Sequence, residues 1–330
     1  MPPLVSIITP SYNQAEYLAY TLQSVFGQDY PAIEYLVVDG GSTDGSVEVI
    51  RECSGRLAWW VSEADAGQAE AINKGLARAK GEILAWLNSD DLYLPGAVGG
   101  AVAALEANPR AGMVYGDAIT IDAQGGVLNP LRYPDWGLID LLGFRIICQP
   151  AVFMRRSALE SAGVLDSSYH FMLDHHLWLR IADEWPVVHV PALWAAARHH
   201  PEAKNVAHAR GFSEETLKLL NWISAHPELG PLVKENRAHV EAGAYRLMGR
   251  YLLDGGEPGA ALNAYRRALV NDPRYTLKHW HRMIYALLSL VGAADLAARY
   301  FQLGRRRKRR ASAELAQLPG LRNWPGLCLQ

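Results

Sequence analysis

"ILAWLNSDDLYLPG", residues 83–96, joins an apolar run to two adjacent carboxylates, Asp90 and Asp91. The run at 83–87 is typical of a buried strand, and the acidic pair follows where that strand would end. Neighbouring like charges repel, and where solvent is limited the repulsion is tolerable only if a cation or strong hydrogen-bond donors offset it. The stretch therefore predicts a strand whose carboxyl end holds a divalent metal.

The residues before this stretch repeat one pattern, an apolar run followed by helical periodicity. After the first run, at 4–8, Asn13 and Glu16 form a capping box for a helix. One face of that helix is apolar and consists of Leu18, Leu22, Val25 and Phe26. The pattern continues with a strand at 35–38, a helix at 47–52, a strand at 57–61, a helix from Gln68 and the strand at 83–87. The predicted order is β-α-β-α-β-α-β.

Such alternation predicts an α/β fold with a mostly parallel sheet flanked by helices. In open sheets of this kind, ligands bind beyond the carboxyl ends of the strands. Asp39, after the second strand, is therefore expected to converge with Asp90 and Asp91 on one crevice. Hard oxygen ligands select Mg²⁺ or Mn²⁺, and substrate phosphates often complete such sites, which predicts a diphosphate-bearing substrate.

Simpler interpretations of these carboxylates stay open. Asp90 or Asp91 can cap the next helix, and Asp39 can close a turn with Gly40 and Gly41. Other phosphate-binding motifs are absent from the sequence: "TPSYNQ" (9–14) follows the first strand where a Gly-x-Gly-x-x-Gly turn would stand, and no Gly-x-x-x-x-Gly-Lys-Ser/Thr occurs. Their absence disfavours a dinucleotide dehydrogenase and a P-loop NTPase.

The composition favours a reducing compartment. The net charge is -2, and Cys53, Cys148 and Cys328 have the spacing of neither a disulfide framework nor a zinc site. The opening "MPPLVSIITP" lacks a basic leader and is expected to form a strand rather than a signal peptide. No stretch approaches the ~20 apolar residues that cross a bilayer. We therefore expect a cytoplasmic protein.

Five motifs follow one another over about residues 3–204. They are "VSIITPSYNQAEYL" (5–18), "VVDGGSTDGS" (37–46), "DAGQAEAINKG" (65–75), "WLNSDD" (86–91) and "MLDHHLWLR" (172–180). In this order and at these separations they resemble the family 2 glycosyltransferases of the GT-A fold. The resemblance implies a Rossmann-like GT-A sheet and transfer of a sugar from a nucleotide-diphosphate donor, with a metal bridging the diphosphate.

The resemblance also implies donor-side roles. Pro10 and Tyr12 would border the nucleotide base, and Asp39 would hydrogen-bond it. Asp90 would contact the ribose side. Lys74, in the third motif, would belong to the same donor-binding group.

The metal, Mn²⁺ or Mg²⁺, would be ligated by Asp91. "RHHPEAKN" (198–205) resembles a late histidine-containing loop of the family that can reach the metal or the diphosphate, and of its two histidines His199 is the candidate. That both histidines merely lie on the surface before a proline stays an open alternative.

Asp174 matches the catalytic base of the family. The sequence departs from the usual pattern around it, because Leu173 stands where many members have Glu and His176 where a second Asp is common. A carboxylate opposite the leaving group can take the proton of the acceptor hydroxyl, which implies a single in-line displacement with inversion. The alternative is an ordinary salt bridge between Asp174 and Arg180.

The second half of the chain is predicted to be helical, which gives a GT-A domain at 1–210 and a helical region at 211–330. Spacing at about 242–275 matches one tetratricopeptide-like helix-turn-helix unit, with Gly255 and Gly256 in the turn. The matching positions are Tyr245, Met248, Gly249, Leu252, Ala261, Tyr265, Ala268 and Pro273.

An uncharged stretch at 283–294 and a basic run at 305–310 suit a helix on an anionic membrane surface, so 283–310 is the expected contact. A core helix with a solvated tail is the alternative. The expected partners are the nucleotide-sugar donor and a saccharide or lipid-linked saccharide acceptor in cell-surface polysaccharide or glycolipid assembly; no nucleic acid is expected. The competing function is a non-catalytic scaffold in a polysaccharide assembly complex.

Overall fold

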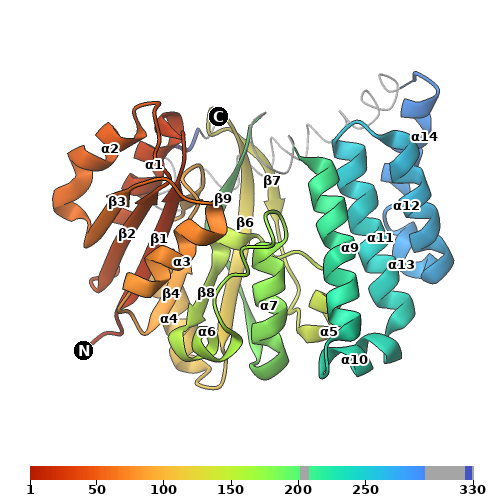
Figure 1. Cartoon of the computed structure of the whole chain (residues 1–330), viewed down its shortest axis with the longest axis horizontal. Coiled ribbons are helices and arrows are strands. Elements are labelled where there is room, and N and C mark those ends of the chain that lie inside the picture. Colours follow the sequence, from red (N-terminus) through yellow and green to blue (C-terminus); the bar gives the residue numbers. More distant parts are fainter. Residues whose placement is uncertain (201–207, 294–323, 329–330) are drawn as a thin grey trace. The chain divides into compact units, whose positions relative to one another are not determined.

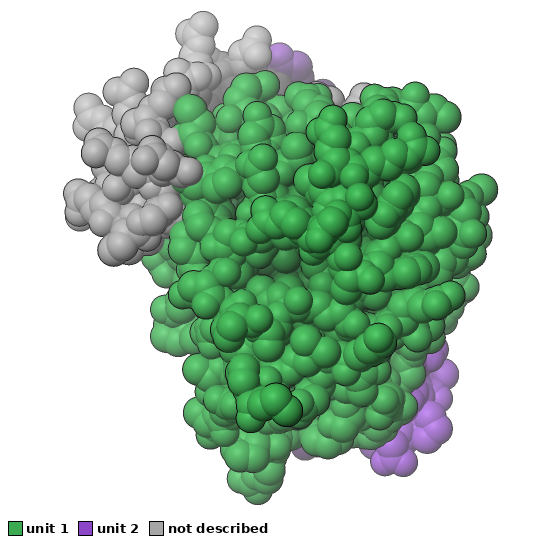
Figure 2. All heavy atoms as spheres, turned by 90° about the vertical axis from the view of Figure 1, so that its left-hand side faces the viewer, with its two compact units in different colours: residues 1–137, 147–199, 310–330 green, residues 138–146, 200–309 purple. Residues whose placement is uncertain are grey.

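The computed structural model describes residues 1–200, 208–293 and 324–328. These residues fall into two compact units, shown in different colours in Figure 2. The first contains 1–137, 147–199 and 324–328, and the second contains 138–146, 200 and 208–293. The sheet lies in the first unit, and the second is helical. The domain boundary expected at 210/211 stays a prediction.

The parallel half of the sheet confirms the predicted alternation (Figure 1). Its strands are β1 (Val5–Ser11), β2 (Ile33–Asp39), β3 (Trp59–Ser62) and β4 (Ile83–Trp86), in the spatial order β3-β2-β1-β4. The intervening segments form α1 (Ala15–Phe26), α2 (Ser46–Cys53), a 3₁₀ turn (Ser54–Arg56) and α3 (Gln68–Arg78). Because these strands are parallel, their carboxyl ends meet at one edge.

The other half of the sheet adds antiparallel pairings to the mostly parallel ladder. Its strands are β5 (Leu92–Tyr93), β6 (Met113–Asp122), β7 (Val127–Leu131), β8 (Val152–Arg155) and β9 (Val187–His199), and the order continues β4-β8-β6-β9-β5, with β7 beside β6. Here β6 and β9 are parallel, and the other pairings are antiparallel. The remaining elements of this unit are α4 (Ala97–Ala107), a 3₁₀ turn (Gln149–Ala151), α6 (Arg156–Ala162) and α7 (Leu173–Glu184).

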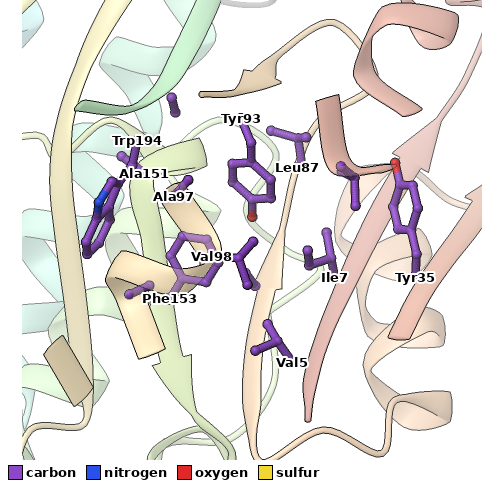
Figure 3. Packing of buried hydrophobic residues seen from close by; sticks show 14 of the residues in the cluster. Val5, Ile7, Tyr35, Leu87, Tyr93, Ala97, Val98, Ala151, Phe153 and Trp194 are labelled. Carbon is purple, nitrogen blue, oxygen red and sulfur yellow. The ribbon is translucent and has the colours of Figure 1, made fainter. Parts of the chain in front are cut away.

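One apolar cluster joins the two halves of the sheet (Figure 3). Ile7 and Tyr35 contribute from β1 and β2, and Leu87 from the residue after β4. Phe153 on β8 and Trp194 on β9 complete it from the other half, and none of the five is more than 2% exposed. Burial of each such side chain stabilises the fold by about 1.5–3 kcal/mol. The cluster therefore fixes the start of the acidic loop.

The start of α1 differs from the predicted capping box. Its N-cap side chain makes no capping hydrogen bond. Instead, the amide of Ala15 donates to Asp44 Oδ2 (2.9 Å), and Asn13, at φ 51°, accepts from the amide of Thr43 (2.9 Å). The prediction for Asn13 and Glu16 is wrong because Asn13 adopts a left-handed conformation and bonds the loop after β2.

Residues 324–328 pack against the sheet unit. Trp324 donates from Nε1 to the carbonyl of Tyr93 in β5 (2.6 Å), and the amide of Cys328 donates to the carbonyl of Gly125 (2.8 Å). Trp324 and Leu327 also contact an apolar cluster built from β5, β6 and β9. This segment therefore supports β5, the strand that directly follows the acidic pair.

The helical unit consists of α5 (Leu138–Leu142), α9 (Ala209–Ala225), α10 (Leu229–Glu235), α11 (Arg237–Asp254), α12 (Pro258–Asn271), α13 (Pro273–Leu277) and α14 (Trp280–Leu290). α11 and α12 form a hairpin with Gly255 and Gly256 in its turn, as predicted. Within α11, Gly249 lets the ring of Tyr265 pack closely, since the ring lies 3.0 Å from where a Cβ would stand. The tetratricopeptide-like class of this hairpin stays a prediction. Within the described ranges, no helix is both long and apolar enough to cross a membrane.

His279, the residue before α14, makes the helical unit sensitive to pH. Burial, together with the positive charges of Arg246 and Arg145, lowers the pKa of His279 to about 4. The unfolded chain therefore takes up a proton near its ordinary pKa of about 6.5, while the folded chain does not, so stability falls as the pH drops from about 6.5 to about 4. Between about pH 7 and pH 5, the free energy of unfolding of His279→Gln is expected to fall by ~1 kcal/mol less than that of the wild type, after allowance for solvent screening. Urea unfolding at both pH values measures this; equal losses would contradict it.

Candidate active site

The carboxyl ends of the parallel strands are in register. Ser11 pairs with Asp39, and Asp39 pairs with Ser62 on its other side. On the opposite flank of β1, Trp86 of β4 pairs with Ile8. Neighbouring strands lie about 4.8 Å apart, so the carboxylates after β2 and β4 are separated by two strand spacings along the same edge.

Asp39 is buried and closes the turn after β2. Its Oδ2 accepts hydrogen bonds from the amides of Gly41 (3.1 Å) and Ser42 (2.9 Å) and from Ser62 Oγ (2.7 Å). Its Oδ1 accepts from Ser42 Oγ (2.5 Å). Gly41 has φ 82°, a backbone conformation that would be strained in a residue with a side chain. Asp39 therefore closes the turn, as the simpler interpretation of the sequence proposes. Its contact with a nucleotide base stays a prediction.

The loop after β1 is held against the loop after β2. The amide of Asn13 donates to Ser42 Oγ (2.8 Å). Tyr12, one residue earlier, is 62% exposed, whereas Pro10 is buried within β1. At this edge, Tyr12 is thus accessible to a ligand, and Pro10 supports the strand from within.

Lys74 on α3 is engaged by Glu63, an acid outside the predicted set. Its Nζ lies 2.7 Å from Glu63 Oε1, and this hydrogen bond raises the pKa of Lys74. Asp65 lies beside the turn after β2, since a Cβ on Gly40 would come within 2.9 Å of Asp65 Oδ2. Sequence reasoning did not single out Asp65. The sequence does contain a signal for Asp65, because this residue follows the third predicted strand in the same way that Asp39 follows the second.

The two carboxylates of the acidic pair have unequal surroundings. Asp91 is 6% exposed, and its Oδ1 and Oδ2 accept hydrogen bonds from the amide of Arg198 (2.9 Å) and from Asn88 Nδ2 (3.2 Å). Asp90 is only partly buried. Burial and the negative charge of Asp90 raise the pKa of Asp91 well above its usual value. The positive charge of Arg198 lowers this pKa but does not cancel the two larger effects, so the pair is unfavourable when both members are ionised without a further cation.

Two buried side chains hold the acidic loop. Arg198 on β9 is 5% exposed, and its Nε donates to the carbonyl of Asp90 (2.9 Å). Thr21 on α1 is fully buried, with Oγ1 at 2.9 Å and 2.8 Å from the carbonyls of Ser89 and Asp91. Neither residue was among the predicted site residues. Arg198 stands directly before His199 in the late loop motif, but no pattern in the sequence marks Thr21.

Asp174 lies in the first turn of α7, where its Oδ1 accepts from the amide of His175 (2.7 Å). One helical turn later, Trp178 stacks on Trp86 with ring centroids 5.1 Å and planes 22° apart. Neither tryptophan is more than 1% exposed. This contact fixes α7 against the end of β4, immediately before the acidic loop.

The Cys148 thiol is influenced both by Asp174 and by the acidic pair. Burial raises the pKa of the Cys148 thiol, and the negative charges of Asp91 and Asp174 raise it further. Both carboxylates therefore lie within electrostatic reach of one side chain. Arg180, the alternative partner of Asp174, instead donates to backbone carbonyls at 162 and 164 (2.7 Å and 2.8 Å).

The residues of the acidic loop fit a hard divalent cation. The two carboxylates offer oxygen atoms to such a cation, which would offset the burial and the mutual repulsion that raise the pKa of Asp91. In the part of the chain that the structure covers, no three His, Cys, Asp or Glu side chains are preassembled as a metal site. His199 is the last residue of β9, and residues 201–205 of its motif lie outside the described residues. The metal role of His199 stays a prediction.

Comparison with known proteins decides the family. The model of glycosyl transferase family 2 matches residues 6–161. An uncharacterized glycosyltransferase of Mycobacterium tuberculosis is 34% identical over 184 residues, which are 54% of this chain and 69% of that protein. The chain belongs to glycosyl transferase family 2. The match to the family 2 model includes Asp39, Asp90 and Asp91, whereas Asp174 lies beyond it.

Two further proteins resemble this family 2 chain. The mannosyltransferase PcManGT of Pyrobaculum calidifontis, solved with GDP-Man and Mn²⁺, superposes with a TM-score of 0.58 at 22% identity, over 89% of this chain and 87% of that one. The O-antigen biosynthesis protein RfbC of Myxococcus xanthus is 30% identical over 186 residues, 55% of this chain but 14% of RfbC. The predicted GT-A fold and the identity as a family 2 glycosyltransferase are confirmed.

Proposed function

We propose that this family 2 protein transfers a sugar from a nucleotide-diphosphate donor to an acceptor hydroxyl, in a metal-dependent single displacement with inversion. The observation that supports the proposal is that the negative charges of Asp91 and Asp174 both act on the Cys148 thiol, as expected if the base candidate and the acidic pair serve one site. Buried Arg198 and Thr21 hold that pair in place, an arrangement that a non-catalytic scaffold does not need.

The donor binds at the ends of β1 to β4, where Tyr12 borders the base, Asp39 with Asp65 lies beside it and Lys74 acts from α3. Asp90 is the direct metal ligand, because it is the more exposed member of the pair. This departs from the ligand expected from the sequence, Asp91, whose oxygens already accept hydrogen bonds. When bound, Mg²⁺ or Mn²⁺ supplies positive charge for the departing diphosphate.

Asp174 takes the proton of the acceptor hydroxyl. The first turn of α7, which the stacked pair Trp86 and Trp178 fixes against the end of β4, supports this role because it limits the movement of the carboxylate. A base on the face opposite the leaving group requires in-line attack, so the anomeric configuration inverts. NMR analysis of a product with retained configuration would contradict this assignment.

We place the reaction in cell-surface polysaccharide or glycolipid assembly, at the cytoplasmic face of a membrane, with a saccharide or lipid-linked saccharide acceptor. The similarity to RfbC, which is named for O-antigen biosynthesis, supports the pathway class. The tetratricopeptide-like hairpin of α11 and α12 would contact partners in that assembly. The basic run at 305–310, expected to add to membrane contact, lies outside the described residues.

Thermal unfolding with UDP, GDP, dTDP and CDP, each with and without Mn²⁺, tests the proposed donor site. One nucleoside diphosphate is expected to stabilise the protein only with the metal, by about 2.7 kcal/mol when its concentration is about 100 times Kd. The matching nucleoside monophosphate is the control, since it lacks the second phosphate. Absence of stabilisation by all four would favour the non-catalytic scaffold.

A further inference from the structure

α14 is apolar on two opposite sides. Its inner side carries Ala286, which is fully buried, and Met283, and both pack with Tyr265 and other apolar residues of α11 and α12. Figure 1 shows α12 lying between α11 and α14. Among the residues that the structure describes, the outer side has no such apolar cover, although the apolar face of a helix is normally buried.

The outer side of α14 forms one continuous apolar stripe. Trp280, Ile284, Leu287 and Val291 recur at intervals of four, three and four residues, which places them on one helical face. They are 49%, 43%, 55% and 71% exposed. One neighbour widens the stripe, Leu277 at the end of α13, which is 52% exposed. We call these five residues the α13–α14 face.

This concentration of exposed apolar side chains is unusual for the chain. Among the described residues, thirteen large hydrophobic side chains are exposed, and seven of them lie between 270 and 291. Scattered single hydrophobic residues on a surface need no explanation, whereas a contiguous patch marks an interaction site. The α13–α14 face is therefore expected to be covered by a partner.

The charges around the face indicate which partner. Residues 273–293 contain Arg274, Lys278 and Arg282 but no Asp or Glu. Arg282 is paired with Asp254 (2.9 Å), whereas Arg274 and Lys278 are exposed on either side of Leu277 and have no acidic partner among the described residues. A second copy would bring the same positive charges together, which disfavours self-association through this face. An anionic surface would pair with them.

We propose that the α13–α14 face docks on the surface of an anionic lipid bilayer. The inference rests on the membrane location in the proposed function and names the surface responsible. α14 has 11 residues, about 16 Å of helix, too short to span a hydrocarbon core of about 30 Å. It therefore lies in the plane of the interface, with Ile284 and Leu287 inserted, Trp280 at the headgroup boundary and the two basic residues on anionic headgroups.

Liposome flotation of the full chain tests the proposal, with phosphatidylcholine vesicles and vesicles that also contain phosphatidylglycerol. The wild type is expected to float with the anionic vesicles and to bind the neutral ones more weakly. The double variant Ile284→Glu/Leu287→Glu is expected to lose at least about tenfold in partitioning. In Arg274→Gln/Lys278→Gln, partitioning onto the anionic vesicles is expected to fall by about fivefold for each residue replaced, and partitioning onto the neutral vesicles should not change.

The matched control is Ile139→Glu/Leu217→Glu, two hydrophobic residues of the same unit, each 40% exposed and outside the face. This control is expected to float like the wild type. The proposal is overturned if the wild type does not float, if Ile284→Glu/Leu287→Glu floats equally well, or if the control loses as much. A concentration-dependent dimer abolished by Ile284→Glu/Leu287→Glu would assign the face to a second copy instead. Nucleotide-dependent thermal stabilisation, measured in parallel, reports folding and the donor site, so failure of either proposal is recognised separately.

Discussion

Replacement of Asp174 by asparagine is expected to lower kcat by about 10²- to 10⁴-fold, the usual contribution of a general base. Asparagine keeps the size of the side chain and an oxygen that can accept from the His175 amide, so α7 should begin as in the wild type. The carboxamide cannot take the proton of the acceptor hydroxyl. Donor binding, measured as metal-dependent thermal stabilisation by the nucleoside diphosphate, should remain unchanged.

Asp183→Asn is the matched control for this variant. Asp183 lies on the same helix, nine residues further along, and near its other end. The control should keep wild-type kcat. Comparable activity of Asp174→Asn and Asp183→Asn would exclude Asp174 as the base, and loss of donor binding in Asp174→Asn would assign it to the donor side instead.

The parallel half of the fold follows from local sequence. Each of its strands is a short apolar run, and each helix has an apolar face such as Leu18, Leu22 and Val25, which is at most 2% exposed. Because hydrophobic periodicity is a pattern of a few neighbouring residues, the order of these elements can be predicted from the sequence without tertiary information. The strand ends then locate Asp39, Asp90 and Asp91 at one edge.

β9 was not predicted because its sequence is a poor strand pattern. "VVHVPALWAAARH" contains Pro191, which cannot donate to a sheet ladder, and several alanines. The structure accommodates the proline by shifting the β6–β9 register between Gly116 and Ala118. Because β9 carries Arg198, the surroundings of the acidic pair could not be derived from the sequence.

The contacts that orient the site join residues far apart in the chain. Thr21 bonds the carbonyl of Asp91 across 70 positions, Arg198 bonds Asp91 across 107, and Trp324 bonds Tyr93 across 231. No local periodicity encodes such pairings. The motifs therefore locate the carboxylates, but they do not show which member of the acidic pair is buried.

That difference within the pair gives the second large expected effect. Asp90→Asn should abolish the metal-dependent stabilisation by the nucleoside diphosphate, about 2.7 kcal/mol at about 100 times Kd, because an amide is a far weaker ligand for a hard cation. Its stability without ligand should rise rather than fall, because the substitution removes the repulsion between the two carboxylates. Asp91→Asn should retain metal-dependent stabilisation, because in our proposal Asp91 positions the loop through Arg198 and Asn88.

The pH dependence separates the two roles independently. The raised pKa of Asp91 means that the folded, metal-free protein binds a proton more readily than the unfolded chain, so this group lowers stability as the pH rises from about 4 toward its folded pKa. Asp91→Asn removes the ionisation and should flatten that part of the profile, and Mn²⁺ should oppose the loss in the wild type. If Asp91→Asn instead abolishes metal-dependent binding while Asp90→Asn keeps it, the direct ligand is Asp91, as the sequence alone predicts. If both variants lose it, the metal requires both carboxylates, and the burial of Asp91 then marks a ligand held ready by Arg198.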